Sequence, residues 1–339
     1  MSIPADQALT ITDALAYWAM ATPDNLAMES PGREPATYEA LNEASARLAA
    51  LLRKLGLGQH DDVALLFPPG PDLSLALLAA VSVGVAIPLP WPMPQAETRR
   101  ALARLPVSAI LVSSICASML PEMAHHAPPA IVFSPGASGR TGDFHIDGRS
   151  IANQTPESSP HEDDIALILH SSGSTSRPKL VPRTHRAIVS TCRNLIDARA
   201  MTAADRCLST AKGGHSQGIN TLTVPLYAGA SQVILPDLTL DALPGWLNAH
   251  RPTYISTTPA LLRLMAADEA AREALRSAPL RCIHSTASPI ATGEVAEFEA
   301  TFGVPVLSGY GMSEATGIAG ERLGAPRVAG AIGTPWCDV

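Results

Sequence analysis

The segment DIALILHSSGSTSRPKLVPRTHR, which runs from Asp164 to Arg186, decides both the fold and the candidate chemistry. An apolar run that ends at His170 predicts a buried strand, and a lysine, Lys179, stands shortly after it. The loop between them begins with Ser171, Ser172, Gly173, Ser174, Thr175 and Ser176. Hydroxyl and backbone N–H groups of such a loop can surround an anion. It is not a Walker A loop, because the G-x-x-x-x-G-K-[ST] pattern is absent.

Basic residues are concentrated in and directly after this loop, in a chain whose formal net charge is −7. Those between positions 177 and 186 are Arg177, Lys179, Arg183 and Arg186. Lysine is otherwise rare, since only Lys54 and Lys212 occur besides Lys179. A local positive charge of this kind suits a polyphosphate ligand. The alternative interpretation is a serine-rich surface turn followed by a solvated basic face.

Helical and strand patterns alternate on both sides of this segment. The predicted helices cover residues 37–55, 73–83, 185–199, 241–250, 259–267 and 292–302. The predicted strands cover residues 63–67, 109–113, 130–133, 165–169, 232–235, 253–256, 281–284 and 304–307. Short strands separated by helices predict an α/β fold with mostly parallel sheets. A stretch rich in Gly, Ser, Pro and charge, at 134–163, indicates two packed α/β subdomains, 1–160 and 161–339.

The composition excludes several classes of protein. Hydrophobic residues make up 46% and charged residues 16% of the 339 residues, which is typical of a globular chain. The negative net charge argues against a general nucleic-acid binder. The five cysteines form no C-x-x-C pair, which favours a reducing cytoplasm over a disulfide framework or a zinc site. The polar N-terminus is unlike a signal peptide, and no apolar run is long enough to predict a membrane span.

The order SSGSTSRPK resembles the phosphate-binding motif of the AMP-forming adenylate ligase superfamily. This superfamily comprises acyl-CoA and aryl-CoA synthetases, luciferases and the adenylation domains of peptide synthetases. The residues that match its usual pattern, T/S-S-G-T/S-T-G-x-P-K-G, are Ser171, Ser172, Gly173, Ser174, Thr175, Pro178 and Lys179. Ser176 and Leu180 depart from the pattern, because they stand where the family usually has glycines.

Further blocks of the chain resemble the same family, in the family's order. TYEALNEASARLAALLRKLGL, from Thr37, is similar to its early helix. The block from Asp205 to Leu226 is similar to the one that carries a pocket histidine, with His215 and Gly218 matching. SGYGMSEATG, from Ser308 to Gly317, resembles the Y-G-x-T-E block, in which Ser313 replaces the usual threonine. The resemblance thus covers nearly the whole chain.

The resemblance implies a reaction in which a carboxylic acid joins the α-phosphate of ATP and pyrophosphate is released. The loop from Ser171 to Ser176, with Lys179, would hold the β- and γ-phosphates. Glu314 would bind Mg²⁺, which prefers carboxylate oxygen. The adenine and the α-phosphate would be bound by Ser288, Tyr310, Gly311 and Ser313. The acid pocket would be lined by His215, Gly218, Ser285, Thr286, Ala287 and Gly309. Lys179, His215, Ser313 and Glu314 would be the catalytic residues.

Each implied role has a simpler alternative. Glu314 could be an acidic residue at a helix start, where the helix dipole favours it. Tyr310 could be an ordinary core residue. His215 lies in the glycine-containing stretch KGGHSQG and could be a loop residue without a role. Lys212, in the same stretch, could be a surface charge.

The family plan continues beyond the end of this chain. It includes an aspartate for the ribose, a hinge and a mobile C-terminal domain with a catalytic lysine, none of which has a counterpart after Trp336. We therefore expect either a fragment of a longer ligase or a shortened member. The first hypothesis is an ATP-dependent carboxylate–CoA ligase, similar to the oxalate-type small-acid ligases. The alternatives are an adenylation domain that loads a carrier-protein phosphopantetheine thiol and a non-catalytic nucleotide-binding or interaction module.

Overall fold

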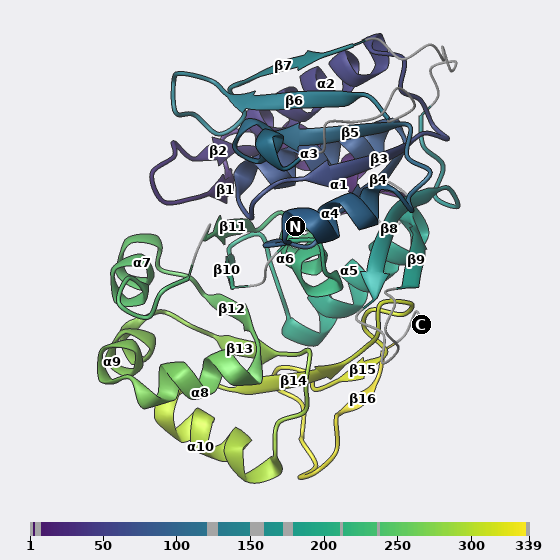
Figure 1. Cartoon of the computed structure of the whole chain (residues 1–339). Helices are drawn as coiled ribbons and strands as arrows, with labels where there is room; N and C mark the ends of the chain where they lie inside the picture. Colours follow the sequence, from purple (N-terminus) through teal and green to yellow (C-terminus); the bar gives the residue numbers. More distant parts are fainter. Residues whose placement is uncertain are drawn as a thin grey trace.

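The chain folds around two β-sheets with helices between and outside them (Figure 1). The structure is a computed structural model that describes residues 3, 8–120, 128–149, 159–171, 179–210, 213–235 and 238–336. No helix in these ranges is both long and apolar enough to cross a lipid bilayer. The mixed α/β class with mostly parallel sheets, expected from the sequence, is confirmed.

The first sheet has seven strands in the order β7-β6-β5-β3-β4-β8-β9. Its inner strands run parallel, whereas the edge strands β7 and β9 pair antiparallel with β6 and β8. The strands are β3 (Asp62–Leu66), β4 (Val85–Pro88), β5 (Ala109–Ser113), β6 (Ala130–Pro135), β7 (Phe144–Gly148), β8 (Ile165–Ser171) and β9 (Lys179–Thr184).

The second sheet has nine strands in the order β16-β15-β14-β13-β12-β10-β11-β1-β2. The six strands from β14 to β1 in this order run parallel, so their carboxyl ends lie along one edge. The strands are β1 (Leu26–Glu29), β2 (Ala36–Thr37), β10 (Arg206–Ser209), β11 (Ser231–Ile234), β12 (Tyr254–Thr257), β13 (Cys282–Ser285), β14 (Val306–Tyr310), β15 (Ala319–Gly320) and β16 (Thr334–Pro335).

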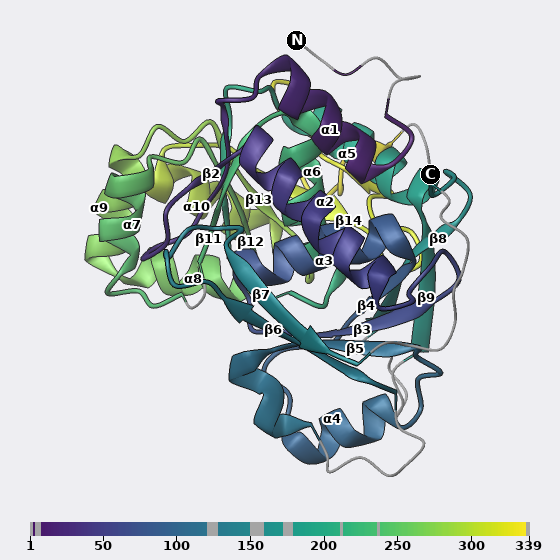
Figure 2. The ribbon, with the colours of Figure 1, turned by 90° about the horizontal axis from the view of Figure 1, so that it is seen from above.

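Helices form one layer between the sheets and one outside each sheet. The inner helices share a core with both sheets, and they are α1 (Ile11–Ala21), α2 (Tyr38–Lys54), α3 (Pro71–Val83), α5 (His185–Arg199) and α6 (Ser216–Ala228). Outside the first sheet lie α4 (Gln95–Leu102) and the 3₁₀ helix Ser114–Met119 (Figure 2). Outside the second sheet lie α7 (Leu243–His250), α8 (Pro259–Ala267), α9 (Glu269–Ser277) and α10 (Thr292–Phe302).

The strand sequences explain why the sheets are covered on both faces. In β3, Val63 and Leu65 belong to the core between the sheets, whereas Ala64 and Leu66 face the outer helix α4. Successive side chains of a strand point to opposite faces, so a strand covered on both sides is apolar throughout. Burying each of the leucines contributes about 2 kcal/mol of hydrophobic free energy.

Caps in the sequence set the starts of the helices that approach the site. Thr184 precedes α5, and its hydroxyl accepts a hydrogen bond from the backbone N–H of Ala187. Thr258 precedes α8 in the same way, with Pro259 at the first helical position. Threonine before a helix satisfies an otherwise unpaired N–H, and proline at that position loses no hydrogen bond. The helices predicted over 185–199, 259–267 and 292–302 have these bounds in the structure.

The two sheets do not divide the chain at residue 160, where the sequence analysis set a boundary. Strands β1 and β2 precede that point but belong to the nine-stranded sheet, and β8 and β9 follow it but belong to the seven-stranded sheet. Each half of the chain therefore contributes strands to both sheets. The division into subdomains 1–160 and 161–339 stays a prediction.

Candidate active site

A large cavity opens where strands of the two sheets approach each other. Its volume is about 1500 Å³, and its wall includes the carboxyl ends of β12, β13 and β14 together with the facing ends of β8 and β9. In parallel α/β sheets, ligands bind beyond the carboxyl ends of the strands. Its position in the fold and its volume both make this cavity the candidate ligand site.

Most of the site residues predicted from the sequence line this cavity. They are Ser171, Lys179, His215, Ser285, Thr286, Ala287, Ser288, Gly309, Tyr310, Gly311, Ser313 and Glu314. Gly218 does not, because it lines a separate small cavity of about 40 Å³ beside α3. Ser172, Gly173, Ser174, Thr175, Ser176 and Lys212 lie outside the described residues.

The ends of the hydroxyl-rich loop lie at the cavity wall. Ser171 ends β8 and pairs antiparallel with Lys179, the first residue of β9. Both residues line the cavity. The Lys179 side chain is exposed there, so its ammonium group is available to an anionic ligand.

Two of the basic residues predicted to surround this loop form contacts within the protein instead of facing the cavity. Arg183 is buried, and Arg186 forms ion pairs with Glu162 and Asp163 at 2.9 and 2.8 Å. Arg177 lies outside the described residues. Of the four basic residues, Lys179 is therefore the one that the described structure presents to the cavity. In β9, Val181 and Arg183 are the buried positions and lie on one face of the strand, whereas Lys179 is exposed at its first position.

Arg183 joins β9 to the loop that carries Glu314. Its Nη1 donates to the carbonyl oxygen of Ser313 at 3.1 Å and to Oγ1 of Thr316 at 2.9 Å. Its Nη2 donates to the carbonyl oxygen of Ala187 and to Oγ1 of Thr191, both at 3.1 Å. Burial lowers the pKa of this guanidinium, but an arginine stays charged. We therefore assign Arg183 a positioning role that sequence reasoning missed.

The loop after β14 presents Tyr310 and Glu314 to the cavity. Half of Tyr310 is exposed, so it is not a core residue. Glu314 lies in an exposed bend rather than in the first turn of a helix. The bend is closed by a hydrogen bond from the N–H of Ala315 to the carbonyl oxygen of Met312 at 3.2 Å. Both simpler alternatives for these two residues are therefore wrong.

His215 lies at the start of α6, close to this loop. It is the residue before the first helical turn, and the next residue, Ser216, places its hydroxyl 3.4 Å from that of Ser313. The surrounding cavity wall lowers the pKa of His215 below its ordinary value. The pKa of His170, which also lines the cavity, is lowered by burial and by His215. Both imidazoles are therefore uncharged at neutral pH.

The turn after β13 has a conformation that fits a binding loop. Ala287 has a φ of 78°, in the left-handed region that residues with a side chain rarely adopt. Such strained positions cluster at ligand sites. Ser285, at the start of the turn, is buried, and no described residue forms a hydrogen bond with its hydroxyl.

The cavity residues that sequence reasoning missed include Arg199, His284 and Trp336. They are nearly buried, with exposed fractions of 5%, 6% and 5%. Gly309 lies against two of them, because a methyl group there would be 2.8 Å from Nε2 of His284 and 3.4 Å from the Trp336 ring. Arg199 and His284 are brought together by α5 and β13, and no spacing in the sequence could indicate that contact.

Comparison with known proteins identifies the family. Residues 15–339 match the AMP-binding enzyme family. The chain is 26% identical to an oxalate–CoA ligase of Arabidopsis thaliana, over 96% of this chain and 65% of that protein. It is 30% identical to an indoleacetate–CoA ligase of Aromatoleum aromaticum, over 94% of this chain and 63% of that protein. The chain thus spans less than two thirds of the length of these relatives.

A solved structure has the same fold. The ATP-bound MatB of Rhodopseudomonas palustris superposes with a TM-score of 0.81 at 23% identity, covering 97% of this chain and 65% of that one. The same family is indicated by the fold, by the motif residues that line the cavity, and by the match over nearly the whole length of the chain. The chain belongs to the AMP-binding enzyme family.

Proposed function

We propose that this chain is the acid-activating core of an ATP-dependent acid–thiol ligase. A carboxylate oxygen of the acid would attack the α-phosphorus of ATP, forming a C–O–P link. The bond from the α-phosphorus to the bridging oxygen would break, and pyrophosphate would leave. The observation that carries the proposal is that Lys179 and Glu314, from distant parts of the sequence, line one cavity at the carboxyl ends of parallel strands.

The phosphate end of the nucleotide fits the wall near β8 and β9. Lys179 and the Ser171 hydroxyl would bind the β- and γ-phosphates, and they would stabilise the charge of the leaving pyrophosphate. Donors aimed at the charge that develops in a transition state lower the barrier more than donors that bind only the ground state. The loop members Ser172 to Ser176 are proposed to assist them.

A magnesium ion fits the carboxylate of Glu314. The described residues contain no group of three His, Cys, Asp or Glu side chains that could enclose a metal by themselves. Magnesium in nucleotide sites is held by one or two carboxylates together with phosphate oxygens, so a single exposed glutamate is a suitable donor. When bound, the ion would neutralise phosphate charge.

The remaining residues would bind the adenine and the acid. Half-exposed Tyr310 could stack on the base, with Ser288 and Gly311 beside it. The acid would lie between His215 and the turn of Ser285, Thr286 and Ala287, above Gly309. Gly218 is removed from this set because it lines the separate cavity. The thiol acceptor is proposed to be coenzyme A, as in the carboxylate–CoA ligases to which the chain is similar.

Acid-dependent exchange of labelled pyrophosphate into ATP tests the proposal. We expect the chain to bind Mg·ATP and to catalyse exchange with at least one acid of a panel. Lys179→Met and Glu314→Gln should each weaken Mg·ATP binding about 10-fold, because a charge-assisted contact is lost. Lys54→Met, an exposed change on α2, is the matched control and should have no effect. Absence of both ATP binding and exchange would contradict the proposal.

A further inference from the structure

A buried arginine on the cavity wall has no carboxylate partner. The guanidinium carbon of Arg199, the last residue of α5, lies 4.9 Å from the centre of the Tyr254 ring. Its Nη2 lies 2.9 Å from Nδ1 of His284. Within the described ranges, no acidic side chain forms an ion pair with Arg199, and its Nε has no hydrogen-bond partner. A buried cation without an anion is energetically costly.

The contact with Arg199 indicates which ring nitrogen of His284 carries the proton. A guanidinium has donors only, so it donates to a ring nitrogen of His284. Its Nη2 lies 2.9 Å from Nδ1 and 3.4 Å from Nε2, and we assign the nearer Nδ1 as the acceptor. The pKa of His284 is well below its ordinary value because of burial and the adjacent Arg199 charge, so the ring is neutral. The ring proton is therefore on Nε2. That N–H is a donor at the point where Gly309 borders the cavity.

Two other buried polar groups line the same cavity. The Ser285 hydroxyl and the Trp336 indole N–H are both buried and both line the cavity, and neither has a hydrogen-bond partner among the residues that the structure describes. A methyl group on Gly309 would lie within 3.4 Å of the Trp336 ring, so the absence of a side chain at this glycine keeps the floor open. Donors without acceptors are the arrangement that an anion requires.

Two comparisons separate Arg199 from the other charged groups nearby. Arg183 also has no ion pair in the described structure, but its guanidinium donates to four oxygen acceptors and does not line the cavity. The cavity carboxylates Glu299 and Glu321 already accept hydrogen bonds from Arg327 and from the N–H of Ser308. Arg199 is thus a cavity cation whose charge no described group meets.

We propose that the acid substrate carries a second anionic group, a carboxylate, which binds Arg199 and the Nε2–H of His284 at the floor of the cavity. This inference rests on the proposed function, and it names the substrate class as dicarboxylic acids. Glycine at position 309 leaves room for that group, while the first carboxylate meets ATP. Charge-assisted hydrogen bonds from a guanidinium are among the strongest that a carboxylate can receive.

The first experiment needs no variant. Binding of acid pairs is measured by calorimetry on the whole chain, in the presence of magnesium and α,β-methylene-ATP, at about pH 7.5. Each pair has the same size and differs by one charge: oxalate and oxamate, malonate and malonamate, succinate and succinamate, phthalate and phthalamate. We expect the best diacid to bind at least 10-fold more tightly than its monoamide. Equal binding within every pair would overturn the inference.

The second experiment changes Arg199. Arg199→Met should abolish the preference for the diacid, leave binding of the nucleotide analogue unchanged and retain binding of the monoamide, whereas Arg199→Lys should keep part of the preference. Arg193→Met, the same change on the same helix, is the control, because Arg193 does not line the cavity. A retained preference in Arg199→Met, or loss of nucleotide binding instead of diacid binding, would contradict the assignment.

The two proposals fail in different ways. If the nucleotide analogue binds but no acid of any kind does, and no exchange occurs, the proposed function fails. If monocarboxylates bind and support exchange while diacids do not, the ligase function stands and the second-carboxylate site is rejected.

Discussion

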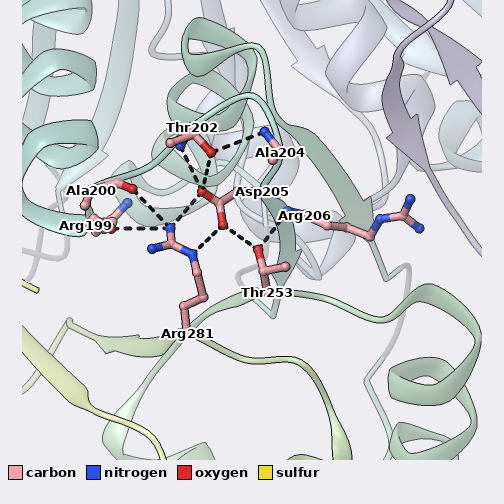
Figure 3. A network of polar contacts seen from close by, with 8 residues as sticks. All are labelled: Arg199, Ala200, Thr202, Ala204, Asp205, Arg206, Thr253 and Arg281. Atoms are coloured by element: carbon pink, nitrogen blue, oxygen red, sulfur yellow. Dashed lines mark hydrogen bonds and ion pairs between the residues drawn. The ribbon is translucent and has the colours of Figure 1, made fainter. Parts of the chain in front are cut away.

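Two clusters built around arginine lie near each other and differ in whether a carboxylate pairs with the arginine. Arg281 donates Nε and Nη2 to Asp205 at 2.8 and 2.7 Å, and Asp205 also accepts from the Thr253 hydroxyl and from the N–H of Thr202 (Figure 3). Arg199, by contrast, has a neutral imidazole and an aromatic ring. Burial alone would raise the pKa of Asp205, but its hydrogen bonds lower it overall.

The difference separates a structural cluster from a binding one. The Asp205 cluster lies at the amino ends of β10 and β13, away from the cavity edge, and every charge in it is paired. The Arg199 cluster lines the cavity. The first also holds the second in place, since Arg281 Nη2 donates to the carbonyl oxygen of Ala200 at 3.2 Å, where α5 ends.

The largest expected effect is on stability, from breaking the paired cluster. Asp205→Ala should lower the free energy of unfolding by about 3 kcal/mol, because Arg281, Thr253 and the N–H of Thr202 lose their acceptor. Asp241→Ala, at an exposed position, should change it by less than about 0.5 kcal/mol. Chemical denaturation measures both. A loss as small as that of the control would show that pairing contributes little here.

A second effect concerns the buried arginine that has neutral partners. Arg183→Met should cost about 2 kcal/mol of stability and raise the Mg²⁺ concentration needed for half-maximal exchange about 10-fold, because the Glu314 loop loses its attachment to β9. The control is Arg186→Met, whose ion pairs are at the surface and which should cost less than about 1 kcal/mol. An unchanged Mg²⁺ requirement would reduce Arg183 to a purely structural residue.

A smaller effect tests the floor of the cavity. Gly309→Ala should place a methyl group 2.8 Å from Nε2 of His284 and weaken acid binding more than ATP binding, at a stability cost of about 1–2 kcal/mol. Gly245→Ala, where a methyl group would meet nothing within 4 Å, should be neutral or slightly stabilising. Calorimetric titration with acid and with nucleotide separates the two affinities. Equal weakening of both would place Gly309 away from the acid.

The last effect is the pH dependence of stability, which is absent well above pH 6.5 and develops below it. Burial lowers the pKa of His185 and His284 below 6.5 in the folded chain. Below pH 6.5 these histidines are protonated in the unfolded chain but stay neutral in the folded chain. The free energy of unfolding therefore falls as the pH decreases, by at most about 1.4 kcal/mol per pH unit for each histidine. Denaturation between about pH 8 and pH 5 should show the decline, and His284→Gln should flatten it. If His284→Gln changed the free energy of unfolding by the same amount at every pH, His284 would not be a neutral buried ring.

The sequence was sufficient to predict the repeating α/β pattern and the motif residues of the site. The runs at 109–113 and 185–199 are apolar or amphipathic and gave strands and helices with the observed bounds. Helix α6 was missed because Gly218 and the internal Pro225 obscure its pattern, and because most of its residues are buried, which leaves no polar stripe. The Arg199 pair could not be predicted, since it depends on a contact between positions 85 residues apart.

We propose that a carboxylate of the acid attacks the α-phosphorus of ATP in this cavity, and the path of the carboxylate oxygen reveals this step. The most direct test uses a diacid labelled with ¹⁸O in its carboxylates, incubated with the chain, Mg·ATP and hydroxylamine, which attacks the carbonyl of an acyl-adenylate. Mass spectrometry of the products should find a single ¹⁸O in AMP and none in pyrophosphate. Formation of ADP with ¹⁸O in inorganic phosphate, or AMP without label, would contradict the account.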